Sequence, residues 1–141
     1  MNIEIREMLI DDYSDVFSLW EQMSGIDLSS SDSRKKIDSF LKSNPGLSLV
    51  ACDGDLLAGA VLCGEDGRRG YIHHLAVDNA YRRCGVASDL IDLCLARLYD
   101  HGIPKCHLSV YGDNDHAIEF WRRTGWTERC ELIMMSRFTA E

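Results

Sequence analysis

The residues best suited to chemistry lie where a predicted strand, ending at Val77, gives way to a predicted helix. This junction reads Arg82-Arg83-Cys84-Gly85-Val86-Ala87. A helix begins with N–H groups that have no intrahelical acceptor and with a partial positive charge. Gly85 and Ala87 leave this backbone uncrowded, and the two arginines add formal positive charge. The junction therefore predicts an anion site of the kind that holds phosphate oxygens on backbone amides.

Charge is distributed unevenly along this acidic chain, whose formal net charge is −8. Four arginines (68, 69, 82 and 83) fall in one stretch that holds a single acid, Asp78. A small, highly charged anion would suit this stretch, although a solvated surface with chance clustering explains it equally well. The overall negative charge argues against a general nucleic-acid-binding protein, because phosphate backbones would be repelled. The motifs of a Walker loop and of a G-x-G-x-x-G dinucleotide site are absent.

The six cysteines, at positions 52, 63, 84, 94, 106 and 130, form no C-x-x-C pair. Zinc sites usually need such close pairs, so no metal site is expected. Small buried hydrophobic side chains in a reducing compartment are the expected role. The sequence has no apolar run near the roughly 18 residues of a membrane span, and residues 1–7 lack the apolar centre of a signal peptide. We therefore expect a cytoplasmic protein without membrane attachment.

Hydrophobic periodicity predicts the elements that precede the junction. Residues 3–6 alternate like a half-buried strand. Asp11 or Asp12 is placed to cap a first helix with apolar residues at 16, 19, 20 and 23, and a second helix is expected over 33–42. Strands are expected over 47–52, 57–63 and 71–77, with a hairpin turn at Asp53-Gly54.

The helix after the junction has the clearest pattern, because its apolar residues at 87, 90, 91, 94, 95 and 98 recur along one face. A strand over 106–111, a helix over 114–124 and closing strands over 126–138 should follow. This order predicts an α/β (α+β) fold in which a mixed sheet carries helices on its faces. The length of 141 residues suits one domain, spanning residues 1–141.

This arrangement resembles the GNAT superfamily of acetyl-CoA-dependent N-acetyltransferases. Members carry Arg/Gln-x-x-Gly-x-Gly/Ala five residues after the closing valine of a strand, and Val77 and Arg82 reproduce this spacing. A second element resembles the family's Asn-x-x-Ala-x-x-Phe-Tyr-x-x-x-Gly-Phe and reads Asn114-x-x-Ala117-Ile118-Glu119-Phe120-Trp121-Arg122-Arg123-Thr124-Gly125-Trp126. The resemblance covers nearly the whole chain and is most specific from residue 71 to residue 126.

The resemblance implies a mostly antiparallel central sheet with helices on both faces and a splay between the strands at 71–77 and 106–111. The first of these strands is expected to carry a bulge. The pantetheine arm of acetyl-CoA would lie in the splay and pair with the backbone of Leu75, Ala76 and Val77. A backbone N–H there would also polarise the thioester carbonyl.

Both motifs imply further contacts with acetyl-CoA. Backbone N–H groups of the first motif would bind the pyrophosphate, and this motif comprises Arg82, Arg83, Cys84, Gly85, Val86, Ala87 and Ser88. The positions of the second motif expected at the cofactor are Asn114, Ala117, Phe120 and Trp121. Asn114 would bond the pantetheine or the loop backbone, and a simple helix cap explains this residue equally well.

A base is needed because acyl transfer to an amine releases a proton. Some family members use a glutamate six residues ahead of the position that matches Val77, but this chain has Tyr71 there, a poor base near neutral pH. Period-two alternation places Tyr71, His73, Leu75 and Val77 on one face and His74 on the other. His73 is therefore the candidate base, since its pKa is near neutrality; a structural role for His73 is the alternative.

The proton donor for the departing thiolate also differs from the family pattern. The usual tyrosine is Trp121 here, and an indole N–H does not release a proton at useful pH. Tyr111, at the end of the predicted strand, is the candidate replacement.

The sequence thus predicts direct transfer of acetyl from acetyl-CoA to a primary amine of a small molecule or peptide. A non-catalytic acyl-CoA-binding module, or an interaction domain without a CoA site, are the alternatives. The acidic balance mildly favours a cationic acceptor. Exposed sheet edges often pair in this family, so the resemblance leaves room for a homodimer.

Overall fold

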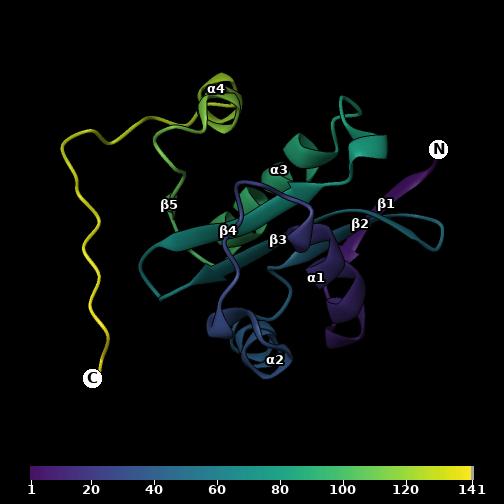
Figure 1. The fold of residues 1–141 in the computed structure, drawn as a ribbon, viewed down its shortest axis with the longest axis horizontal. Helices are drawn as coiled ribbons and strands as arrows, with labels where there is room; N and C mark the ends of the chain where they lie inside the picture. The colour runs from purple at the N-terminus through teal and green to yellow at the C-terminus, as the bar shows by residue number, and fades with distance from the viewer. Residues whose placement is uncertain (141) are drawn as a thin grey trace. The chain divides into compact units, whose positions relative to one another are not determined.

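The computed structural model describes residues 1–140, and the chain forms two compact units, Met1–Ser109 and Val110–Glu141 (Figure 1). None of the helices in the described part combines the length and the hydropathy of a membrane span.

The first unit contains a five-stranded sheet whose strands are ordered as in the sequence. The strands are β1 (Ile3–Glu7), β2 (Leu49–Asp53), β3 (Leu56–Glu65), β4 (Gly70–Val77) and β5 (Cys106–Leu108). Neighbouring strands from β1 to β4 are antiparallel, whereas β5 runs parallel to β4. Gly54, at φ +60°, makes the turn between β2 and β3. The predicted mixed, mostly antiparallel sheet is confirmed.

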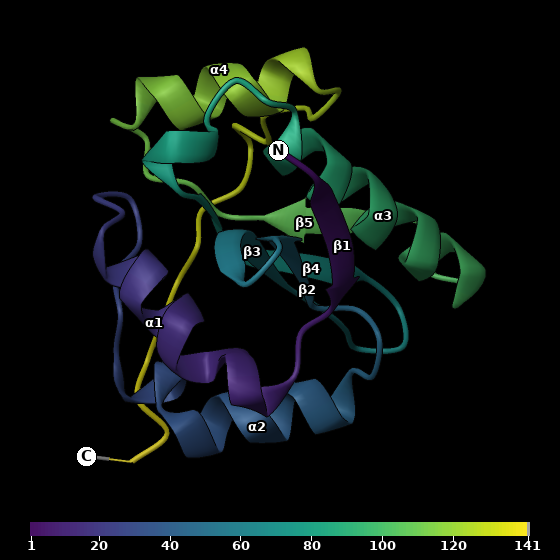
Figure 2. The ribbon, with the colours of Figure 1, turned by 90° about the vertical axis from the view of Figure 1, so that its right-hand side faces the viewer.

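Two helices, α1 (Tyr13–Glu21) and α2 (Arg34–Ser43), cover one face of this sheet (Figure 2). Trp20 and Val16 of α1 are fully buried there, in one cluster with Leu62 of β3 and Ala76 of β4. Burying each large apolar side chain contributes about 1.5–3 kcal/mol. Both helices fall within two residues of their predicted bounds. Asp12 does not cap α1 as predicted, because its carboxylate binds the Arg6 guanidinium and the Leu9 N–H instead.

The long helix α3 (Val86–Asp100) packs on the opposite face of the sheet. Leu90, Ile91, Cys94 and Leu98 are buried, as the apolar spacing predicted. Ala87 and Leu95, which the same spacing predicted, are only half-buried, and the remaining buried residue is Val86. A Cβ on Gly59 of β3 would lie 3.1 Å from Val86 Cγ1 and 3.0 Å from the Ala76 carbonyl oxygen. The first turn of α3 therefore approaches the strands closely because residue 59 has no side chain.

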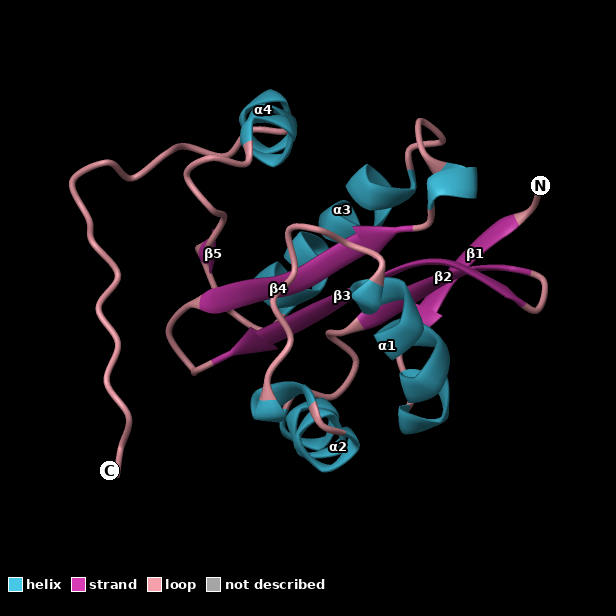
Figure 3. Cartoon of the chain, viewed as in Figure 1, coloured by secondary structure: helices cyan, strands magenta, loops and turns pink. Residues whose placement is uncertain are grey.

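The second unit contains α4 (Asp115–Arg123), followed by residues in no regular secondary structure (Figure 3). The closing strands predicted over 126–138 are therefore wrong for this structure, and the strand predicted over 106–111 ends at Leu108. Strand-like sequence patterns become strands only when a neighbour supplies ladder hydrogen bonds. Within residues 1–140, the segment after α4 has no such neighbour.

Candidate functional site

A bulge interrupts the pairing of β4 with β3. His73 lies opposite Leu62, and Ala76 lies opposite Ala60, so three steps along β4 match two steps along β3. His74 within this interval has φ +52°, a left-handed conformation that residues other than glycine rarely adopt. The bulge that the resemblance implied for this strand is confirmed.

The bulge also changes which side chains share a face. Ala76 packs in the cluster beneath α1, and Val77 lies opposite Gly59 on the α3 side. The His74 ring lies 5.0 Å from the Trp20 ring of α1. His74 therefore lies on the face opposite Val77, as predicted. The prediction that His73 shares its face with Val77 is wrong, because the His73 ring lies 6.1 Å from the Phe40 ring of α2, on the side of the sheet that carries α1 and α2. The extra residue reverses the alternation from which that prediction was made.

The ladder between β4 and β5 is short. Three residue pairs join residues 70–72 to residues 106–108. Beyond them, residues 73–77 of β4 continue with no β5 partner in the described part of the chain. Strand separation therefore begins where the resemblance implied a splay, and the backbone edge of Leu75, Ala76 and Val77 has no ladder on that side.

The loop between β4 and α3 leaves the start of the helix open. Two of its residues have left-handed backbones, Arg83 at φ +64° and Gly85, the N-cap, at φ +78°. Residues 82–85 are all exposed, and a Cβ on Gly85 would meet nothing within 4 Å. The Asp89 N–H donates to the Gly85 carbonyl at 3.0 Å, and this is the first hydrogen bond of the helix. The amides of residues 86–88 therefore have no intrahelical acceptor.

The positive charge at this helix start has two sources. The helix dipole contributes about half an elementary charge, and the adjacent arginines contribute full charges. The Arg82 guanidinium lies 3.7 Å from Met23 Sδ, just beyond the end of α1. This arrangement suits a diphosphate, because backbone amides and cationic side chains approach from neighbouring positions.

His74 ties three segments of the first unit together. Its Nε2 lies 2.8 Å from Oδ1 of Asp32, a carboxylate in the short helix η2 (Ser30–Asp32) that is only 7% exposed. The other carboxylate oxygen accepts the Ser29 N–H at 3.0 Å. Trp20 Nε1 donates to the His74 carbonyl at 3.1 Å. Both the ring and the backbone of His74 are therefore held.

Sequence reasoning missed this Asp32–His74 pair. The Ser29-x-x-Asp32 spacing is a local capping signal, and the structure shows this capping box. Nothing in the sequence pairs residue 32 with a residue 42 positions later, however, because that contact depends on the bulge.

His73 is the exposed member of the histidine pair. Its ring lies parallel to the Tyr71 ring at 6.4 Å and edge-on to the Phe40 ring of α2 at 6.1 Å. Desolvation by these surroundings lowers the pKa of His73, the charge of His74 lowers it further, and the Asp32 carboxylate opposes the shift. The imidazole is therefore neutral at pH 7 and able to accept a proton.

The remaining predicted site residues belong to the second unit. The Asn114 side chain caps α4, accepting the Ala117 N–H at 3.2 Å, as the alternative explanation of this residue expected. Trp121 packs between two aromatic rings, 5.0 Å from Phe120 and 5.2 Å from Trp126. Tyr111 precedes the helix and is exposed. His73, residues 75–77 and residues 82–88 all belong to the first unit.

The thiols differ in their surroundings. Cys63 and Cys94 are buried, as predicted, whereas Cys84 and Cys130 are exposed. A hydrogen bond with Cys94 and burial raise the pKa of Cys63, and burial raises the pKa of Cys106 to about 12. These two thiols are therefore protonated and weakly nucleophilic near neutral pH.

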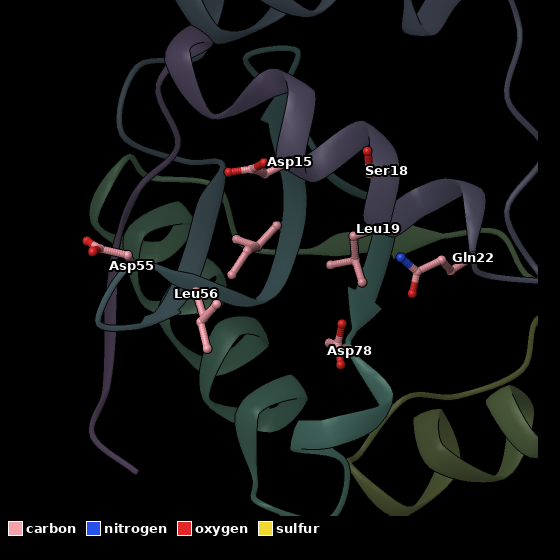
Figure 4. A pocket seen from close by; sticks show the side chains of 8 residues that line it. Asp15, Ser18, Leu19, Gln22, Asp55, Leu56 and Asp78 are labelled. Carbon is pink, nitrogen blue, oxygen red and sulfur yellow. The ribbon is translucent and has the colours of Figure 1, made fainter.

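An open pocket of about 220 Å³ lies at another place in the first unit (Figure 4). Its lining comprises Asp15, Ser18, Leu19, Gln22, Asp55, Leu56, Leu57 and Asp78. Three carboxylates give it negative charge, which is unsuited to a phosphate group. None of the predicted site residues lines it.

Comparison with known proteins decides the family. Residues 4–126 match the family described as "Acetyltransferase (GNAT) family". The chain belongs to this family. "Acetyltransferase SG1711" of Sodalis glossinidius (strain morsitans) is 32% identical over 135 residues, which cover 96% of this chain and 94% of that protein.

Two solved structures share the GNAT fold. The PaiA N-acetyltransferase of Thermoplasma acidophilum, in complex with coenzyme A, superposes with a TM-score of 0.78 at 20% identity, covering 90% of this chain and 91% of that one. AAC(6')-Iy, in complex with a bisubstrate analogue, CoA-S-monomethyl-acetylneamine, gives 0.80 at 14% identity, covering 98% and 99%. The fold of residues 1–140 is thus that of GNAT acetyltransferases.

Proposed function

We propose that this GNAT-family chain acts as one cytoplasmic acetyltransferase domain, residues 1–141, that transfers acetyl from acetyl-CoA directly to a primary amine. One structural relationship carries the proposal. The bulged strand β4 leaves its ladder with β5 shortly before the open N-terminus of α3. An unpaired strand edge and a helix start, separated by a short loop, suit the two halves of an acyl-CoA molecule.

The amides of residues 83–88 would bind the pyrophosphate, with Arg82 adding charge. The backbone of Leu75, Ala76 and Val77 would pair with the pantetheine arm and hydrogen-bond the thioester oxygen. Asn114, Ala117, Phe120 and Trp121 complete the set that the family motif assigns to the cofactor. Coenzyme A in the PaiA structure supports acetyl-CoA as the co-substrate.

His73 is the proposed proton acceptor. The lowered pKa of this imidazole keeps it neutral, and His73 is exposed. His74 is less suited, because its Nε2 is already engaged by Asp32. The Asp32–His74 pair would instead stabilise the bulge of β4 and influence the pKa of His73 through its charges.

Tyr111 is the proposed proton donor to the departing thiolate. General acid catalysis contributes roughly 10²–10⁴-fold, and the indole of Trp121 does not supply it. Direct transfer needs no enzyme thiolate, which agrees with the raised pKa values of Cys63 and Cys106.

The acceptor is proposed to be a cationic amine of a small molecule or a peptide. The aminoglycoside portion of the analogue bound to AAC(6')-Iy is an example of a small-molecule amine. The net charge of −8 would attract such acceptors over short distances.

The deciding experiment measures CoA thiol release from acetyl-CoA across a panel of aminoglycosides, polyamines and peptides, with product masses determined for any active amine. Sustained, amine-dependent release with an acetylated product supports the enzyme. Tight acetyl-CoA binding with no thiol release for any amine would instead indicate a non-catalytic acyl-CoA-binding module. Tyr71 and Trp121, which replace the family's usual acid–base residues, are the sequence features that support this alternative. Absence of CoA binding would overturn both.

A further inference from the structure

The loop between β4 and α3 begins with a short helical turn that is tied to a different part of the sheet. This turn is η3 (Asn79–Tyr81), and Arg82 follows it directly. The Tyr81 hydroxyl donates to Oδ2 of Asp53, the last residue of β2, at 2.8 Å. Tyr81 is only 9% exposed. The turn before the loop arginines is therefore anchored both by packing and by a hydrogen bond.

Asp53 is well prepared to accept this hydrogen bond. Its other carboxylate oxygen, Oδ1, accepts the Asn2 N–H at 3.1 Å, just before β1. The hydrogen bond from Tyr81 lowers the pKa of Asp53, and the bond from Asn2 lowers it further. Asp53 is therefore ionised near neutral pH, and a hydrogen bond to an ionised oxygen is stronger than one between neutral groups.

The part of the loop that follows needs such an anchor. Residues 82–85 are exposed and lie between two buried residues, Tyr81 and Val86. Arg83 within this part has φ +64°, a strained conformation for a residue other than glycine. Strained backbone persists only where the flanking residues hold it. Helix α3 holds Val86 on one side, and the bond to Asp53 holds Tyr81 on the other.

We propose that the Tyr81–Asp53 hydrogen bond positions residues 82–88 to receive the pyrophosphate of acetyl-CoA, which makes Tyr81 and Asp53 positioning residues for the cofactor. This inference rests on the proposed function, in which the same residues bind the pyrophosphate. Asp53 carries the same sign of charge as the pyrophosphate, so its favourable effect comes through Tyr81 rather than through contact with the ligand.

The physical basis is the cost of ordering the loop. Binding one anion on backbone amides requires several N–H groups to point to the same place at once. A loop that is already held in this arrangement loses less conformational entropy when the ligand binds. Removing the anchor should therefore weaken the binding of ligands that contain the pyrophosphate and spare those that lack it.

The test compares coenzyme A with pantetheine, which lacks the pyrophosphate and the nucleotide. Calorimetry gives the Kd of coenzyme A, and an NMR titration gives the weaker Kd of pantetheine. Tyr81→Phe should raise the Kd of coenzyme A by about threefold to tenfold and leave that of pantetheine unchanged. Tyr13→Phe is the matched control, because its hydroxyl donates to the Asp32 carbonyl at 2.6 Å, outside the loop. This control should leave both Kd values unchanged.

A second comparison places Tyr81→Phe in an Asp53→Ala background. There the substitution should have no effect on the Kd of coenzyme A, because the acceptor of the hydroxyl is already gone. Both proteins of this comparison lack the Asp53 charge, so the loss of that charge cancels. An undiminished effect of Tyr81→Phe in this background would overturn the role of the Tyr81–Asp53 bond.

The two ligands separate the possible failures. Equal weakening of both ligands in Tyr81→Phe would indicate a general effect on the fold, and the positioning role would be wrong. Wild-type affinities for both ligands in Tyr81→Phe would also overturn that role while leaving the pyrophosphate site in place. A wild-type protein that binds coenzyme A no more tightly than pantetheine would refute the pyrophosphate site itself, and the positioning role with it.

Discussion

The ring of His74 lies 2.8 Å from the carboxylate of Asp32, and this contact joins the bulge of β4 to the short helix before α2. The left-handed backbone of His74 would cost roughly 1–3 kcal/mol on its own. The Asp32 contact and the Trp20 hydrogen bond to the His74 carbonyl offset that cost. The irregular part of β4 is therefore held by α1 and η2 rather than by its own strand pairing.

Gly85→Glu is expected to abolish CoA binding while the fold is retained. The new carboxylate would project beside the amides of α3 and repel the pyrophosphate, and no atom lies within 4 Å of the position of its Cβ. Gly67→Glu is the matched control, because Gly67 has a similar φ of +88° and equally open surroundings in the turn before β4. Calorimetric titration with CoA measures the effect. Wild-type affinity in Gly85→Glu would refute the assignment of this loop.

His73→Ala is expected to lower kcat/KM with an active amine by roughly 10²-fold or more at neutral pH. In the wild type, kcat/KM should fall as the pH drops through the pKa of His73, which is held below its ordinary value of about 6.5. The alanine variant should lack this acid limb. His101→Ala, at the exposed end of α3, is the control. If the pH profiles of the wild type and of His73→Ala coincided, His73 would not be the base.

Asp32→Asn is expected to move that acid limb to lower pH. Desolvation and the charge of His74 lower the pKa of His73, and the Asp32 carboxylate raises it. Removing that carboxylate should therefore lower the pKa of His73 further. The imidazole resonances of His73, followed by NMR through a pH titration, measure the shift directly. Asp38→Asn, which breaks the exposed ion pair with Lys42, should leave the resonances unchanged. A His73 pKa that stays the same in Asp32→Asn would contradict the coupling.

Asp32→Ala should also destabilise the first unit, by about 1–3 kcal/mol, because the Ser29 N–H and the His74 ring lose a buried partner. Urea denaturation monitored by far-ultraviolet circular dichroism measures the free energy of unfolding. A loss no larger than that of Asp38→Ala would show that the pair contributes nothing to the fold.

Tyr111→Phe is expected to lower kcat with little change in CoA affinity, because the substitution removes only the phenolic hydroxyl that would protonate the thiolate. Tyr99→Phe, on the exposed side of α3, serves as the comparison. The two effects are separated by steady-state kinetics together with calorimetric CoA titration. A Tyr111→Phe enzyme as fast as Tyr99→Phe would exclude the tyrosine as proton donor.

Local sequence signals predicted those elements whose pattern lies within one contiguous segment of the chain. The apolar spacing of α3 corresponds to its buried face, and the turn predicted at Asp53-Gly54 is present one residue later, at Gly54-Asp55. The faces of β4 were mispredicted after His73, because a single extra residue reverses every later side chain and no residue type in the strand announces it. The Asp32–His74 contact was missed for the same reason. The strands expected over 126–138 have no strand neighbour within residues 1–140, and a local pattern cannot predict whether a neighbour is present.

The close packing around Gly59 limits which residues can replace it. A methyl group there would press on the carbonyl of Ala76 and on the side chain of Val86 at once. Ala76 belongs to the strand proposed to face the thioester, and Val86 to the turn proposed to face the pyrophosphate. A bulkier residue would therefore force these two backbones apart, and a cofactor of fixed length could no longer reach both. The absence of one side chain thus determines the separation of the two halves of the site, although Gly59 itself would touch neither half of the ligand.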